Sequence, residues 1–202
     1  MNWETLMCFG DSITIGARSY CGYPEYCGDL LEKIIGNKWN VVNHSVSGYT
    51  AIDLNRYISG NFHNLTSFNP SLVTVLIGTN DIKSGTSLEN FEIAYNQILI
   101  KAKLIAMRKN VLLIKIPHLP PKVMYPYYYK MNDDIAKFNE KLEELAAKNN
   151  VRITQFHITE EDLFDGVHFN EYGSRNTGKQ LSDYVLADRG VFMGSDSQGN
   201  KN

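Results

Sequence analysis

The chain has 202 residues, of which 43% are hydrophobic and 21% are charged, and its formal net charge is −2 at pH 7. This composition predicts a globular protein with a hydrophobic core rather than a disordered chain. The sequence has no basic patch of the kind that indicates a nucleic-acid partner, and it has no apolar run as long as a membrane span. We expect one domain over residues 1–189, followed by a polar tail over residues 190–202 that is rich in Gly, Ser and Asn.

Strand-like and helix-like patterns alternate along this domain. The predicted strands are continuous apolar runs at Leu6–Phe9, Asn40–Asn43, Leu72–Ile77, Val111–Ile116 and Val151–Phe156. The predicted helices repeat apolar residues at helical spacing over Pro24–Ile35, Ser87–Lys109, Asn132–Asn149 and Asn170–Leu186. Alternation of this kind predicts an α/β protein. We expect a three-layer α/β/α sandwich around a five-stranded parallel sheet, because continuous apolar strands are buried on both faces.

Four polar segments follow predicted strands. They are Gly10–Gly16, Asn43–Gly48, Gly78–Asp81 and Asp165–His168. In a parallel sheet the carboxyl ends of the strands meet at one rim, where ligands bind, so these segments are expected to lie together. Each has an ordinary structural explanation when taken alone, as a helix cap, a turn or a glycine with positive φ. Their convergence on one rim favours a catalytic site.

The residue types in these segments fit nucleophilic catalysis. Ser12 stands at a strand-to-helix turn, where a serine hydroxyl is presented at the end of a sheet. A serine needs an adjacent base, for which His168 is the candidate, and the base needs a group that fixes its tautomer, for which Asp165 is the candidate. The N–H groups of Ser12 and Gly48 and the side-chain amide of Asn80 are candidate donors for an oxyanion.

In combination these motifs resemble those of the SGNH, or GDSL, hydrolases. The resemblance runs from Gly10 to the helix after His168 and rests on Gly-Asp-Ser-Ile-Thr, Ser-Gly, Gly-Thr-Asn-Asp and Asp-x-x-His in the family's order. It implies a flavodoxin-like fold and a serine esterase that needs no cofactor and no metal. It also implies the triad of Ser12, His168 and Asp165, with Gly48 and Asn80 as oxyanion donors.

Two positions depart from the family's usual pattern. Ser45 stands where glycine is common, and Phe169 stands where proline often follows the histidine. Neither change removes a reacting group. We expect Ser45 to tighten the second loop and Phe169 to reshape the wall beside His168.

Several rim residues are candidate substrate contacts. The segment Met124–Met131 carries four tyrosines, and two of them, Tyr127 and Tyr128, are candidates because phenol rings suit a sugar face or an acyl pocket. The alternative is a surface loop packed by its own aromatic rings. His118 and Asp11 are further candidates. We expect Asp11 and Asp81 to act mainly as acceptors that fix loops, and His118 is more easily explained by packing in its turn.

The predicted function is hydrolysis of carboxylic esters with a small acyl group, with O-acetyl groups on a carbohydrate as the first choice. The alternative within enzymes is a lipid-directed esterase, such as a lysophospholipase or a thioesterase, which would need a long apolar groove. A binding module that has lost catalysis is the alternative outside enzymes. Neither the oligomeric state nor the acyl length follows from the sequence.

The cysteines and the N-terminus bear on the compartment. Three cysteines argue against a disulfide framework, and two separate thiols at Cys21 and Cys27 are favoured over a pair. No Cys/His spacing is typical of a zinc site. No signal peptide is recognisable after Met1, so a cytoplasmic protein is expected. A secreted or periplasmic location stays open if Met1 is a processed or engineered start.

Overall fold

The computed structural model describes residues 3–107 and 110–191. Its sheet has five parallel strands in the order β2-β1-β3-β4-β5. The strands are β1 (Trp3–Gly10), β2 (Lys38–Asn43), β3 (Leu72–Leu76), β4 (Val111–Ile114) and β5 (Arg152–Thr154). All five predicted strands are present, and the predicted parallel α/β sandwich is confirmed. The last two are shorter than predicted, because the apolar residues after Ile114 and Thr154 belong to rim loops rather than to the sheet.

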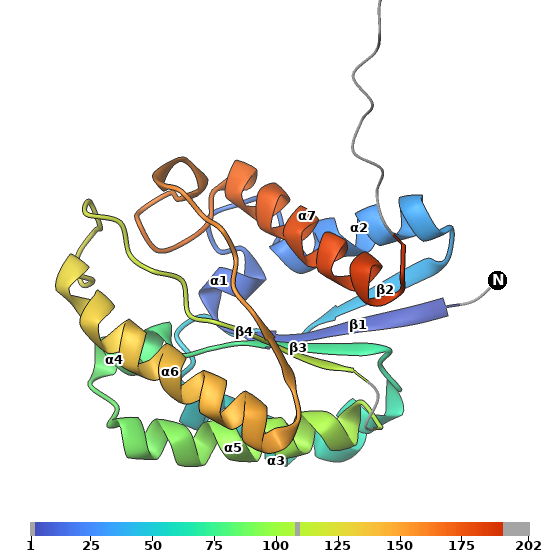
Figure 1. Cartoon of the computed structure of the whole chain (residues 1–202), viewed down its shortest axis with the longest axis horizontal. Helices are drawn as coiled ribbons and strands as arrows, with labels where there is room; N and C mark the ends of the chain where they lie inside the picture. Colours follow the sequence, from blue (N-terminus) through green and yellow to red (C-terminus); the bar gives the residue numbers. More distant parts are fainter. Residues whose placement is uncertain (1–2, 108–109, 192–202) are drawn as a thin grey trace, which may run out of the picture.

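Helices cover both faces of this sheet (Figure 1). They are α1 (Ser12–Ile15), α2 (Tyr23–Ile35), α3 (Ala51–Ser67), α4 (Thr79–Ser84), α5 (Leu88–Ile105), α6 (Asn132–Asn149) and α7 (Glu171–Asp188), with 3₁₀ turns η1 (Tyr129–Met131) and η2 (Glu160–Asp162). Helices α2 and α7 pack together on one face, whereas α3, α5 and α6 lie on the other. The predicted helices correspond to α2, α5, α6 and α7. Helix α5 ends at Ile105, before the predicted Lys109, because Met107 has a positive φ of 49° that breaks the helix. Lys109 itself and the tail beyond Val191 lie outside the described residues.

Helix α3 is absent from the sequence-based prediction. Thr50 caps it by accepting from the N–H of Asp53, and the Asp53 carboxylate accepts from the N–H of Thr50. Such a capping box, followed by apolar residues at helical spacing, was a readable signal. The many Asn, Ser and Thr residues between the apolar positions obscured it, because these residues also favour turns.

The strand order creates the position at which the site forms. The chain passes from β1 to the edge strand β2 and then returns past β1 to β3. The connections therefore leave β1 and β3 in opposite directions, and a crevice opens beyond their carboxyl ends. Gly10 at the end of β1 pairs with Leu76 at the end of β3. The segments that begin with Asp11 and Gly78 thus start side by side.

The structure also bears on the state of the cysteines and on membrane-spanning helices. Cys8, Cys21 and Cys27 are all free thiols, which confirms the prediction of separate thiols. Cys8 and Cys27 are buried among the core side chains. Over residues 3–107 and 110–191, no helix is both long enough and apolar enough to cross a membrane.

Candidate active site

Ser12 is the first residue of α1 and follows β1 after a sharp turn. Gly10 makes this turn possible, since a Cβ there would lie 2.2 Å from Thr14 Oγ1 and 2.7 Å from the Leu76 carbonyl oxygen. Asp11 caps the short helix by accepting from the Ile13 N–H at 3.0 Å. Ser12 therefore stands at a helix N-terminus, where backbone N–H groups have no intrahelical acceptor.

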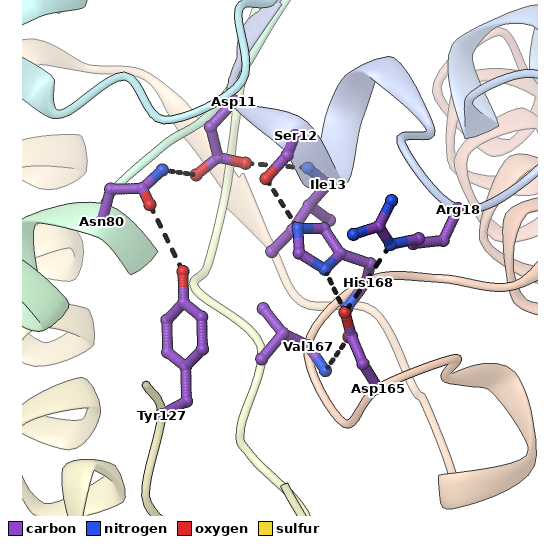
Figure 2. Close-up of polar contacts among 9 residues, drawn as sticks. All are labelled: Asp11, Ser12, Ile13, Arg18, Asn80, Tyr127, Asp165, Val167 and His168. Atoms are coloured by element: carbon purple, nitrogen blue, oxygen red, sulfur yellow. Dashed lines mark hydrogen bonds and ion pairs between the residues drawn. The ribbon is translucent and has the colours of Figure 1, made fainter. Parts of the chain in front are cut away.

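Ser12, His168 and Asp165 form one hydrogen-bonded chain (Figure 2). Ser12 Oγ lies 2.8 Å from His168 Nε2, and His168 Nδ1 lies 2.7 Å from Asp165 Oδ2. The other carboxylate oxygen of Asp165 accepts from the N–H groups of Val167 at 3.0 Å and of His168 at 2.8 Å. The fold thus brings together three side chains from opposite ends of the chain in the arrangement that the sequence predicted.

These contacts keep Asp165 ionised. Partial burial by itself would raise the pKa of this carboxyl, but the hydrogen bonds from the His168 N–H, the His168 imidazole and the Val167 N–H outweigh it, so the pKa is below the ordinary value. An ionised Asp165 accepts a hydrogen bond from His168 Nδ1–H, which fixes the tautomer whose lone pair lies on Nε2, facing Ser12.

Gly48 and Asn80 are the other two predicted oxyanion donors, and Asn80 lies on the far side of Ser12 from Asp165 (Figure 2). Gly48, in the loop after β2, has φ +83° and open space where a Cβ would stand. Asn80, in α4, is only 2% exposed. Its Nδ2 donates to the Tyr49 carbonyl oxygen at 3.0 Å and to Asp11 Oδ2 at 3.3 Å, while its Oδ1 accepts from the Tyr127 hydroxyl at 3.3 Å. Both amide protons are thus engaged, and a substrate oxyanion would have to replace one acceptor.

Asp11 and Asp81 fix loops, as predicted for both. Asp11 joins α1 to Asn80, and Asp81 Oδ2 accepts from the Ala51 N–H at 2.8 Å, which ties α4 to the start of α3. Asp11 is only 1% exposed and its carboxylate is engaged by the Ile13 N–H and Asn80, so these contacts fit the loop-fixing role and the further prediction that Asp11 contacts substrate stays a prediction. Burial raises the pKa of Asp11 to about 7 and that of Asp81 to about 6.

The other predicted substrate contacts do not gather at Ser12. Tyr127 is 9% exposed and its hydroxyl donates to Asn80 Oδ1, so its polar group is turned to Asn80 rather than to Ser12 (Figure 2). Tyr128 is 54% exposed and lines a hollow with Lys130 and residues of α6. His118 lines a separate hollow of about 720 Å³, whose lining includes neither Ser12 nor His168. The sequence placed these residues on the correct rim but could not orient their side chains.

The structure describes both departures from the family pattern. The Ser45 N–H donates to Asn43 Oδ1 at 3.3 Å, a contact that glycine would also make, and the Ser45 hydroxyl is buried without a hydrogen-bond partner, so the tightening of the loop by this serine stays a prediction. Phe169 is 1% exposed and packs edge-on against Tyr23 and Phe156, with ring centroids 6.4 and 6.5 Å away. Phe169 therefore fills the core below His168 and forms no wall of the site, which corrects that expectation.

Arg18 is a neighbour of the triad that the sequence did not indicate. Its Nε lies 4.0 Å from Asp165 Oδ2, and its guanidinium lies 5.8 Å from the centroid of the Phe164 ring. Asp165 and Phe164 also line a hollow of about 470 Å³ together with Met124. Arg18 stands in a turn after α1 and belongs to no motif. In the part of the chain that the structure describes, no group of three or more His, Cys, Asp or Glu side chains could hold a metal ion.

A parallel α/β sandwich with a Ser–His–Asp chain at the carboxyl edge of its sheet defines the class of α/β serine hydrolases. The chain belongs to the GDSL-like lipase/acylhydrolase family, whose model matches residues 8–175. It is a carboxylic ester hydrolase. No curated protein sequence matches it at a significant level.

Solved structures share its fold at low sequence identity. A variant of Axe2, an acetyl xylan esterase from Geobacillus stearothermophilus, has a TM-score of 0.69 and 19% identity over 96% of this chain and 97% of its own. The acetyl xylan esterase AlAXEase has a TM-score of 0.73 and 22% identity, covering 90% and 99%. An inhibitor-bound aryl esterase from M. smegmatis has a TM-score of 0.73 and 19% identity, covering 94% and 100%.

Proposed function

We propose that this chain removes small acyl groups, with O-acetyl on a carbohydrate as the preferred substrate class, through an acyl-enzyme on Ser12. The observation that carries the proposal is the continuous hydrogen-bonded chain from Asp165 through His168 to Ser12, at 2.7 and 2.8 Å. In this proposal Ser12 is the nucleophile, His168 is the general base and Asp165 orients the base.

The geometry supports the usual order of steps. His168 Nε2 takes the Ser12 proton as Oγ attacks the ester carbonyl, and the proton then passes to the leaving alcohol. Negative charge on the former carbonyl oxygen meets the N–H groups of Ser12 and Gly48 and the amide of Asn80. For Asn80 to take part, the oxyanion replaces Asp11 as acceptor, since that contact is the longer of the two at 3.3 Å. Water, deprotonated by His168, then hydrolyses the acyl-enzyme.

Two observations favour a small acyl group on a polar alcohol. The hollow beside Asp165 includes neither Ser12 nor His168 in its lining, but it adjoins the triad through Asp165, and its Lys122 and Glu160 suit a polar leaving group better than a lipid tail. Two proteins of the same fold are described as acetyl xylan esterases. A lipid-directed esterase would require a long apolar groove to bind its acyl chain.

A panel of p-nitrophenyl esters from acetate to palmitate, measured beside acetylated xylooligosaccharides, tests the substrate class. We expect kcat/KM to be higher for acetate than for esters of eight carbons or more, because about 0.8 kcal/mol per CH₂ is recovered only if a groove buries the chain. A steady gain from acetate to decanoate would contradict the proposal and favour the lipid-directed esterase. Failure of a fluorophosphonate to label Ser12 would instead favour a binding module.

Replacing Asn80 with alanine tests the oxyanion assignment. We expect kcat to fall about 100- to 1,000-fold with little change in KM, because the donor acts on charge that exists only in the transition state. Steady-state kinetics on p-nitrophenyl acetate measures both constants. The exposed Asn90→Ala is the matched control and should behave as wild type. A rise in KM with unchanged kcat would move Asn80 to ground-state binding.

A further inference from the structure

The segment Met124–Met131 contains four tyrosines in very different environments. Tyr125, Tyr128 and Tyr129 are 82%, 54% and 55% exposed, whereas Tyr127 is 9% exposed. Tyr127 alone of the four turns inward, toward Asn80 (Figure 2). A buried phenol needs a hydrogen-bond partner, and the Tyr127 hydroxyl finds one in Asn80 Oδ1. Because Asn80 is a predicted oxyanion donor, this contact bears on the reaction.

The Asn80 amide is held from both ends. On the nitrogen side two acceptors, the Tyr49 carbonyl and the Asp11 carboxylate, lie at 3.0 and 3.3 Å. On the oxygen side the Tyr127 hydroxyl donates at 3.3 Å. With this arrangement the nitrogen faces Asp11, the residue next to Ser12, and the oxygen faces away from it (Figure 2).

Tyr127 is itself fixed and stays a donor. Its N–H donates to the Met124 carbonyl oxygen at 3.1 Å, and the Lys83 ammonium lies 5.7 Å from the centroid of its ring. Burial, followed by the charges of Asp11 and Asp165, raises the pKa of the Tyr127 hydroxyl to about 12. The phenol therefore keeps its proton over the whole range in which an esterase of this kind is assayed.

We propose that Tyr127 is a positioning residue for the reaction: its hydroxyl holds the Asn80 amide in the orientation that offers Nδ2 to the oxyanion. This inference rests on the proposed function of Asn80 as an oxyanion donor. Tyr127 touches neither the nucleophile nor the substrate in this role. It acts through the amide, which it orients and also polarises, because a hydrogen bond to an amide oxygen strengthens the N–H groups as donors.

Tyr127 contributes to the reaction at the step in which the oxyanion forms. At that moment Asn80 exchanges its contact with Asp11 for one with the substrate, and an amide anchored at its oxygen makes the exchange with little rearrangement. Without the Tyr127 hydroxyl, the buried Asn80 Oδ1 has lost its donor and the amide tilts to find another. The cost falls on the transition state, so kcat should change and KM should not.

The test is a double-mutant cycle between Tyr127→Phe and Asn80→Ala, with kcat and KM measured on p-nitrophenyl acetate. Tyr127→Phe removes one oxygen atom, and we expect kcat to fall roughly 3- to 10-fold with KM changed less than about twofold. In the Asn80→Ala background the same substitution should have no further effect on kcat, since the group on which it acts is gone. Tyr129→Phe, an exposed tyrosine of the same segment, is the matched control and should match wild type.

The possible outcomes distinguish failure of the positioning role of Tyr127 from failure of the oxyanion assignment of Asn80. Unchanged kcat in Tyr127→Phe, or an equal loss of kcat with and without Asn80, overturns the positioning role. A rise in KM alone would show that Tyr127 binds substrate, which also overturns it. Full activity of Asn80→Ala is the distinct failure of the oxyanion assignment. Rates are referred to the sites titrated by a fluorophosphonate, so a variant that folds only in part still gives a value for its folded fraction.

Discussion

Replacing Ser12 with alanine is expected to reduce ester hydrolysis by at least about 1,000-fold and to leave the fold intact. The substitution removes the hydroxyl that faces His168 Nε2, and without it no acyl-enzyme can form. Stability should change little, because the hydroxyl's contact is with the imidazole and the helix cap of α1 comes from Asp11 rather than from Ser12. The measurements are kcat/KM on p-nitrophenyl acetate and the midpoint of thermal unfolding.

Ser67→Ala is the control for this variant. Ser67 is an exposed serine in the last turn of α3, at the end of that helix remote from Thr50 and the site loops. It should retain wild-type kinetics and unfold at the same temperature. Residual activity of Ser12→Ala above about a thousandth of wild type, once contaminating esterase is excluded, would contradict a covalent mechanism at Ser12.

Asp165→Asn is expected to lower kcat by about 10,000-fold, the loss typical of an amide in place of the triad acid. The carboxylate oxygen Oδ1 accepts from the N–H groups of Val167 and His168, so the amide oxygen of asparagine will take that place. The amide nitrogen then faces His168 Nδ1 and donates to it. The ring proton moves to Nε2, where it blocks the lone pair that must accept the Ser12 proton.

Steady-state kinetics of Asp165→Asn, with Asp133→Asn as control, measures this effect. Asp133 is an exposed aspartate in the first turn of α6 and has no role in the site, so its variant should be fully active. The side chain of asparagine can still accept the hydrogen bonds from the N–H groups of Val167 and His168, and we therefore expect a folded protein. Wild-type kcat in Asp165→Asn would show that the pairing of Asp165 with His168 has no part in the reaction.

Local patterns in the sequence were enough to predict most of the fold. Helix α6 begins and ends at the predicted residues, because Ile135, Phe138 and Leu142 mark one buried face without interruption. The central strands β1 and β3 were also predicted, since continuous apolar runs occur where both faces of a strand are buried, although β1 begins at Trp3, before the predicted Leu6. Helix α3 was missed, because its buried residues are separated by side chains that are as common in turns.

The same local reasoning reached Ser12, Gly48, Asn80, Asp165 and His168. Each of them follows a strand or precedes a helix of the parallel sheet, and the topology of such a sheet brings these loops to one rim. The candidate site could therefore be predicted from residue types and their order along the chain, together with the resemblance of these motifs to those of the GDSL hydrolases.

Only the tertiary structure decided which way the neighbouring side chains point. Tyr127 and Tyr128 are consecutive and chemically identical, yet Tyr127 is buried against Asn80 and Tyr128 faces solvent. Arg18 lies close to Asp165 although the two residues are far apart in the sequence and no motif links them. Residue types and spacing determine which groups reach a rim. The orientation of each group there depends on packing between distant segments, which lies outside any local pattern.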